Sequence, residues 1–163
     1  MSIDFRIRPY VAGDLPSLRR MVLGLQQAEH RMEPDRAVWA DDGGTYTDWI
    51  MEEVAGKSGA IFMAESADGI AIGMVSCWRV EDETDITVRP EARAHLYVSD
   101  IFVIDSWRGR NVAGALLDAA DAHGRALGLA FVTIGLLAVN HAAQRAYEKS
   151  GFQAYEVYLR KRL

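Results

Sequence analysis

The segment DSWRGRNVAGALL, residues 105–117, places two arginines between an apolar stretch and a helix-like stretch. Arginine presents forked N–H donors that match phosphate oxygens. The first turn of a helix adds unpaired backbone N–H groups and a partial positive charge, and glycine lets the backbone turn sharply beside a ligand. We therefore expect a pyrophosphate site formed by Arg108, Gly109, Arg110, Asn111, Val112, Ala113 and Gly114.

Two common phosphate-binding motifs do not fit this segment. It lacks the Lys-Ser/Thr ending of a P-loop. It does not match GxGxxG, and it follows a late strand rather than the first one, unlike a dinucleotide-binding loop. The alternative interpretation is an ordinary strand-to-helix loop with solvated arginines.

The segment NHAAQRAYEKSGF, residues 140–152, contributes a second pattern. Asn140, Ala143 and Tyr147 are spaced i, i+3 and i+7, so they share one face of the expected helix. A half-buried packing role is the alternative interpretation for Tyr147.

Together the two segments resemble the GNAT superfamily of acetyl-coenzyme A-dependent N-acetyltransferases. RGRNVA fits the motif A pattern Arg/Gln-x-x-Gly-x-Gly/Ala, with Asn111 in place of the first glycine, and residues 140–152 resemble motif B. Asparagine is one of the few residues besides glycine that adopt a positive φ, so we expect the turn to keep its shape.

The resemblance implies direct acetyl transfer from acetyl-coenzyme A to a primary amine. It implies that the pantetheine arm pairs with the backbone of Ile101, Phe102 and Val103, and that the phosphates lie on the motif A loop. It also implies that the helix face carrying Asn140, Ala143 and Tyr147 meets the coenzyme.

Two residues are expected to be catalytic. The resemblance implies that Tyr147 protonates the leaving thiolate and that Asp100, which interrupts the apolar run YVSDIFVI, takes the amine proton. A base is needed because a lysine-like amine, with a pKa near ~10.4, must lose a proton before it attacks. Alternatively, Asp100 only positions a cation or caps a loop. Glu29 and His30 are expected to be a solvated helix end rather than a wall of the acceptor site.

Hydrophobic periodicity predicts the elements that position these residues. We expect strands at residues 3–10, 60–66, 70–80, 95–104, 129–138 and 152–163, and helices at 12–31, 45–59, 111–128 and 140–151. This order predicts one α/β (α+β) domain over residues 1–163, with a mixed, mostly antiparallel sheet flanked by about four helices. The resemblance adds that the central strands 95–104 and 129–138 are parallel and splay apart.

Charge and composition restrict the partners. The net charge is −9 over residues 1–105 and +4 over residues 106–163, which suits a cationic acceptor, such as a polyamine or aminoglycoside, and an anionic coenzyme. The chain shows no extended Lys/Arg stripe for nucleic acid, no apolar run long enough for a membrane span and no signal peptide. We therefore expect a cytoplasmic protein that acts on a small-molecule or peptide amine.

The remaining residues with chemical potential favour structural roles. We expect the single cysteine, Cys77, to be a buried thiol, and the four dispersed histidines show no metal-ligand spacing. The four tryptophans are expected to be packing residues. Two other functions stay open, a catalytically silent acyl-coenzyme A binding module and a flavodoxin-like nucleotide binder, and the strand at residues 152–163 suggests a homodimer.

Overall fold

The computed structural model describes residues 4–39 and 42–163. In this part of the chain the sheet has the order β1-β2-β3-β4-β5. The strands are β1 (Phe5–Pro9), β2 (Ala60–Ser66), β3 (Ala71–Glu81), β4 (Ala94–Val103) and β5 (Val132–Ile134); the helices are α1 (Leu15–Met32), α2 (Gly44–Gly56), α3 (Pro90–Arg93), α4 (Val112–Ala126) and α5 (His141–Lys149), with short 3₁₀ turns at Ala12–Asp14 and Asp105–Trp107.

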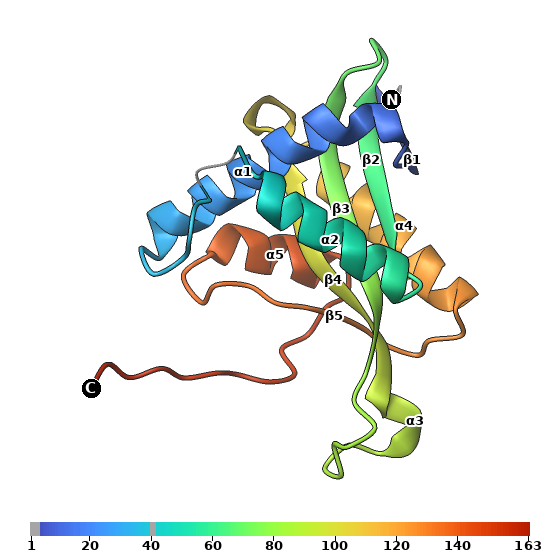
Figure 1. The fold of residues 1–163 in the computed structure, drawn as a ribbon, viewed down its shortest axis with the longest axis vertical. Helices are drawn as coiled ribbons and strands as arrows, with labels where there is room; N and C mark the ends of the chain where they lie inside the picture. Colours follow the sequence, from blue (N-terminus) through green and yellow to red (C-terminus); the bar gives the residue numbers. More distant parts are fainter. Residues whose placement is uncertain (1–3, 40–41) are drawn as a thin grey trace.

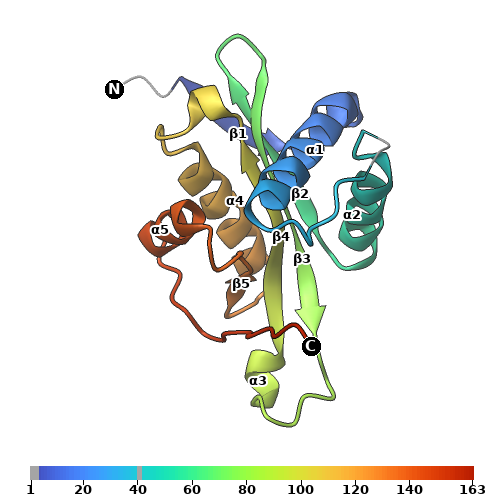
Figure 2. The ribbon, with the colours of Figure 1, turned by 90° about the vertical axis from the view of Figure 1, so that its left-hand side faces the viewer.

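Helices cover both faces of the sheet (Figures 1 and 2). Helices α1 and α2 lie on one face, and α4 lies on the other with α5 beside it. Each face has its own apolar cluster, because each strand points alternate side chains to opposite faces. The α1/α2-side cluster comprises Leu18, Met21, Val22, Ile50, Ile61, Met63, Met74 and Trp78. The α4-side cluster comprises Ala64, Ile72, Val75, Cys77, Leu96, Val98, Val103, Val112, Leu116, Leu117 and Ala120.

The mixed sheet expected from the element order is confirmed. The first four strands pair antiparallel, and β4 pairs parallel with β5 after the α4 crossover. The parallel pair nevertheless lies at one edge of the described sheet rather than in its centre. The reason lies in the C-terminal segment: residues 152–163, expected to be a strand, form no regular structure and are mostly exposed, so they do not extend the sheet beyond β5.

A β-bulge in β4 changes which face its side chains point to. Opposite Cys77 lies Val98, but opposite Ser76 lies Asp100, so Ser99 is an extra residue in β4. Before the bulge, Val98 faces the α4-side cluster; after it, Val103 faces that cluster. Asp100 therefore points to the α1/α2 side, where it contacts both Ser76 and α2.

An ion-pair network ties the start of α1 to the sheet. Arg8 on β1 makes two hydrogen bonds to Asp14, at 2.7 and 2.8 Å, and one of 2.6 Å to Glu65 on β2. Arg6 donates to the same Glu65. Asp14 is the N-cap residue of α1, but its carboxylate makes no capping hydrogen bond, because it accepts from Arg8 and from the backbone N–H of Val11.

Candidate active site

The loop before α4 has the backbone conformation that the sequence suggested. Asn111 adopts φ 62° and ψ 19°, in the left-handed region, and Gly109 has φ 75°. The first backbone bond of α4 runs from the Ala115 N–H to the Asn111 carbonyl, at 3.1 Å. The amides of Val112, Ala113 and Gly114 precede that ladder, as expected for a helix N-terminus that receives an anion.

The Asn111 side chain lies against the first turn of α4. A Cβ placed on Gly114 would come within 2.4 Å of the Asn111 Oδ1 atom, so the carboxamide occupies the space that a larger residue at 114 would need. A larger residue at 114 would therefore force the Asn111 carboxamide to move away from the first turn of α4.

The two arginines of the loop are held near its base. Arg108 donates from Nε to the Val103 carbonyl at 3.2 Å and pairs with Asp105 at 2.9 Å. The Arg110 guanidinium stacks over the Trp107 ring, 4.9 Å from its centroid. Both side chains therefore keep their positive charge beside the amides of α4. An anionic pyrophosphate fits this combination of helix N-terminus, left-handed turn and two guanidinium groups.

Strand β4 has an open edge directly before this loop. Strand β5 pairs with β4 at Leu96, Tyr97 and Val98 only, which leaves the rest of β4 beyond the parallel pairing. Ile104 donates its N–H to Ile72 on β3, so by alternation Phe102 also directs its backbone to β3. The residues that present backbone groups to the open edge are then Ile101 and Val103, and the Val103 carbonyl already accepts from Arg108.

Helix α5 presents the expected face. The Asn140 side chain caps the helix by accepting the Ala143 N–H at 3.1 Å, and Ala143, Ala146 and Tyr147 are half-buried while the other residues of α5 are exposed. The Tyr147 ring packs near Phe152, with centroids 6.0 Å apart. Burial raises the pKa of Tyr147 to about 12, and the negative charges of Glu29 and Asp100 add to the shift. Tyr147 is thus a neutral proton donor at neutral pH.

Asp100 is a buried carboxyl group held by hydroxyl groups. Only 4% of its surface is exposed. Tyr46 on α2 donates to Oδ1 and Ser76 on β3 donates to Oδ2, each at 3.1 Å. Burial raises the pKa of Asp100, hydroxyl donors including Ser99 and Tyr46 oppose the shift, and the charge of Glu29 reinforces it. A carboxylate with a raised pKa is a stronger base than an exposed one.

Glu29 belongs to the same region, contrary to the expectation of a solvated helix end. Its side chain is 26% exposed and pairs with Arg36 at 3.0 Å. Its charge raises the pKa of Tyr97, after the larger effects of burial and of Asp100, and also that of Tyr147. His30 is exposed, and its Nδ1 lies 2.7 Å from the Arg36 carbonyl. The end of α1 thus brings a second negative charge close to Asp100.

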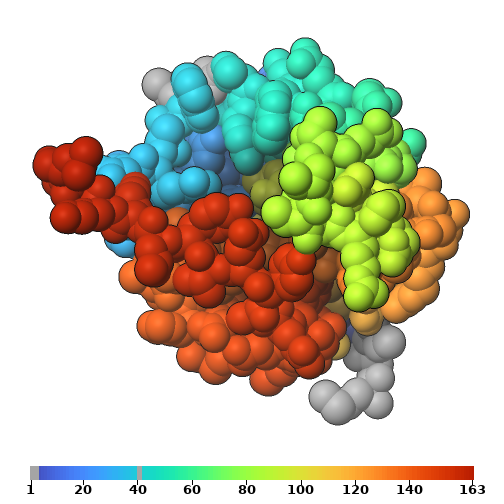
Figure 3. Space-filling view, turned by 90° about the horizontal axis from the view of Figure 1, so that it is seen from below, coloured from blue at the N-terminus to red at the C-terminus, as the bar shows by residue number. Residues whose placement is uncertain are grey.

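The space-filling view from below shows a hollow over β4 (Figure 3). Around it stand the end of α1 with the following loop, α2, the loop between β3 and β4, and the region of α5. The fold also brings five residues from segments far apart in the sequence within electrostatic range of one another: Glu29, Tyr46, Tyr97, Asp100 and Tyr147.

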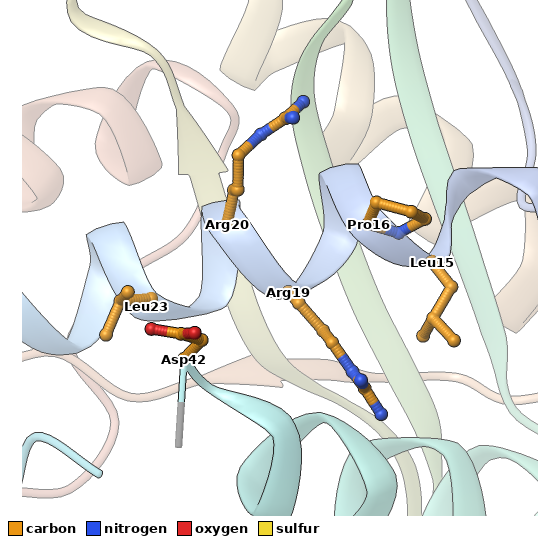
Figure 4. Close-up of a pocket in the computed structure, with 6 residues that line it drawn as sticks. All are labelled: Leu15, Pro16, Arg19, Arg20, Leu23 and Asp42. Carbon is orange, nitrogen blue, oxygen red and sulfur yellow. The ribbon is translucent and has the colours of Figure 1, made fainter. Parts of the chain in front are cut away.

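A second groove, of about 390 Å³, lies along the first half of α1 (Figure 4). Since α1 rises 1.5 Å per residue, this groove is well separated from Glu29 near the other end of the helix. The six side chains that line it are Leu15, Pro16, Arg19, Arg20, Leu23 and Asp42.

Sequence reasoning missed the partners of Asp100. Ser76 lies inside an apolar strand, where a single serine gives little signal, and Tyr46 is one of several aromatic residues on α2. Both become functional candidates only through the bulge, which turns Asp100 toward them. Cys77 is fully buried as expected, and burial raises the pKa of its thiol to about 11.

Comparison with known proteins identifies the family. The model of the acetyltransferase (GNAT) family matches residues 24–152, most of the chain and both segments singled out above. The chain belongs to the GNAT acetyltransferase family.

Individual relatives agree with this assignment. The uncharacterized N-acetyltransferase YycN of Bacillus subtilis (strain 168) is 31% identical over 74 residues, a match that spans 45% of this chain and about half, 46%, of that protein. A mutant of the BH1408 protein from Bacillus halodurans has the same fold, with a TM-score of 0.85, 16% identity and coverage of 97% and 99% of the two chains. The aminoglycoside N-acetyltransferase AAC(6')-Iy, solved in complex with CoA, has a TM-score of 0.69 at 25% identity, with 98% and 95% of the chains covered.

Two further structural findings concern the described residues alone. No helix within residues 4–39 and 42–163 combines the length and apolar character that a membrane span requires. In the same ranges no three His, Cys, Asp or Glu side chains gather where a metal ion would bind.

Proposed function

We propose that this protein is an acetyl-coenzyme A-dependent N-acetyltransferase that modifies a primary amine of a small molecule or of a protein. The observation that supports this most is Asp100, a buried carboxyl group with two hydroxyl partners, whose negative charge also acts on Tyr147. Coenzyme use is supported by the amides and arginines before α4 and by the relative solved with CoA.

The coenzyme is proposed to bind along the seam between β4 and α4. The amides of Val112, Ala113 and Gly114, together with Arg108 and Arg110, hold its pyrophosphate. The open edge of β4 then receives the pantetheine arm at Ile101 and Val103, as an added strand pairs with a sheet edge. The ring of Phe102, the residue between these two, packs against α1 at Gly24. The coenzyme would supply an acetyl thioester and leave as the free thiol.

Asp100 is proposed as the general base. An amine enters the hollow as an ammonium ion, and the charges of Asp100 and Glu29 attract it. Asp100 then takes up one proton through a water molecule, which leaves a neutral amine able to attack. The raised pKa of Asp100 makes this transfer less uphill than it would be to an exposed aspartate.

Tyr147 is proposed as the general acid. Its hydroxyl is protonated at neutral pH, because its pKa is raised to about 12. It gives a proton to the departing thiolate, and the tyrosinate then takes the second proton of the acylated amine nitrogen through water, which yields the neutral amide. Asn140 and Ala143 on the same face let the coenzyme approach α5 closely.

The test is a thiol-release assay with acetyl-coenzyme A and a broad panel of amines, including polyamines and aminoglycosides. We expect release with at least one amine, a large loss of turnover for Tyr147→Phe with little change in coenzyme affinity, and loss of the acidic limb of the pH–rate profile for Asp100→Asn.

The opposite results are equally clear. Thermal stabilisation by the coenzyme without thiol release for any amine would instead favour a catalytically silent binding module. Unchanged turnover in Tyr147→Phe would refute its acid role, and an unchanged pH profile in Asp100→Asn would refute the base role.

A further inference from the structure

An aromatic groove lies beside the proposed catalytic base. The groove has a volume of about 340 Å³ and is lined by Trp39, Thr45, Tyr46 and Trp49. Large side chains usually bury their surface, but Trp39 is 50% exposed and Trp49 is 41% exposed. Two indole rings that face solvent across one concave surface are unusual for packing residues and are typical of a binding surface.

Contacts with other aromatic side chains hold Trp49 in place in this groove. Trp49 meets Tyr46 at a centroid distance of 5.2 Å and Trp78 at 5.5 Å, and Trp78 meets Tyr97 at 5.7 Å. Trp78 is only 2% exposed, so it anchors Trp49 to the sheet. A rigid aromatic wall binds a flat partner without first losing much side-chain entropy.

The loop that carries Trp39 is also anchored. The backbone N–H of Trp39 donates to the side-chain oxygen of Gln26 at 3.3 Å, and Gln26 is a buried residue of α1. The two indoles therefore come from separately held elements, the loop after α1 and helix α2. Their arrangement is built into the fold.

Tyr46 connects the groove to the base. Its ring lines the groove, while its hydroxyl donates to Asp100 at 3.1 Å. The aromatic groove is therefore separated from Asp100 by one tyrosine side chain, and the negative charge of Glu29 acts on the same carboxyl group. Such a site complements a molecule with an ammonium group at one end and an apolar ring at the other.

We propose that the acceptor is an arylalkylamine, whose ring lies between Trp39 and Trp49 while its ammonium group faces Asp100 and Glu29. This inference rests on the proposed N-acetyltransferase function and narrows it. A polyamine or aminoglycoside carries hydrogen-bonding groups over its whole length, and the aromatic lining would desolvate them without replacement. A phenyl or indole ring gains from the same lining by burial and by ring–ring contact.

The experiment compares 2-phenylethylamine with ethylamine, which has the same ammonium group and no ring. In the thiol-release assay we expect kcat/KM to be at least tenfold higher for 2-phenylethylamine, mainly through KM. Trp49→Leu and Trp39→Leu should each lower the ratio of kcat/KM for 2-phenylethylamine to that for ethylamine by about tenfold, equivalent to about 1.4 kcal/mol. Phe131→Leu is the matched control, because Phe131 is an aromatic residue, 53% exposed, outside the groove.

The outcomes separate this inference from the proposed function. If spermidine or kanamycin releases thiol and 2-phenylethylamine does not, acetyl transfer stands and the arylalkylamine assignment is overturned. If no amine releases thiol, calorimetric titration with 2-phenylethylamine decides: saturable binding that Trp39→Leu weakens about tenfold supports the groove, and absence of binding overturns it. Trp39 lies in a loop, so its variant remains informative if Trp49→Leu, which loses contact with Trp78, fails to fold.

Discussion

Removing the Tyr46 hydroxyl should shift the pH dependence of the enzyme without removing its activity. In the structure this hydroxyl donates to Oδ1 of Asp100 at 3.1 Å, inside a site where Asp100 is 4% exposed. The donor favours the charged carboxylate, so Tyr46→Phe raises the pKa of Asp100 further above its usual range. The base then stays protonated to a higher pH, and the rising limb of kcat/KM moves to the alkaline side.

The size of the effect follows from the hydrogen bond. A hydrogen bond to a charged group contributes about 1.5–3 kcal/mol. The protonated carboxyl group still accepts from a hydroxyl, which makes the lower figure appropriate for the difference between the two states. At about 1.4 kcal/mol per tenfold, kcat/KM on the acidic limb should fall by about tenfold, while the alkaline plateau changes little.

The assay is the full pH profile of kcat/KM for wild type, Tyr46→Phe and Ser76→Ala. Ser76 donates to the other oxygen of Asp100 at the same distance, so its loss should move the limb in the same direction. Tyr97→Phe is the control: Tyr97 also lies near Asp100, and its hydroxyl is not the donor to either carboxylate oxygen in the hydrogen bonds described above. If Tyr46→Phe leaves the limb in place while Asp100→Asn removes it, the reasoning about this hydrogen bond is wrong.

Two stability predictions follow from packing and from charge. Gly24→Ala should gain about 1 kcal/mol in helix propensity but lose about 1–3 kcal/mol to overpacking, because its Cβ would lie 2.8 Å from the Phe102 ring. Gly56→Ala is the control, because a Cβ there meets open space and only the gain in helix propensity should appear. Equal rises in melting temperature for the two variants would contradict the predicted clash at Gly24. Asp14, whose pKa the Arg8 guanidinium lowers, contributes stability above its unfolded-state pKa of about 3.9 and loses it as the pH falls through the lower folded value. Asp14→Asn should therefore lower the melting temperature at pH 7, with a difference from wild type that shrinks in acid; a difference independent of pH would show that the charge does not matter.

Local signals in the sequence predicted the backbone around the proposed coenzyme site. The turn at Asn111, the start of α4 and the cap of α5 at Asn140 depend on a few neighbouring residues, and the structure has all three where the sequence predicted them. The strand-helix-strand order of the sequence predicted the parallel pairing of β4 and β5, which the structure confirms.

The acceptor side was not predictable in the same way. It depends on contacts between residues far apart in the sequence, such as Tyr46 with Asp100 and Glu29 with Arg36. No periodic pattern marks such pairs. The expected C-terminal strand failed for a related reason: alternation of apolar residues shows that residues 152–163 suit a strand, but a strand forms only where an edge pairs with it.

The bulge at Ser99 also limits how this chain can change over evolutionary time. If Ser99 joined the regular alternation of β4 instead of bulging, every later residue of the strand would change face, and Asp100 would turn to the face of Leu96 and Val98, into aliphatic surroundings with no hydroxyl partner. Loss of the bulge conformation would therefore separate the proposed base from its hydroxyl partners and bury an unpaired carboxyl group, which is costly. Loops around the hollow are free to vary in length, whereas β4 tolerates a shorter chain only at the bulge itself, where removal of Ser99 leaves Asp100 opposite Ser76.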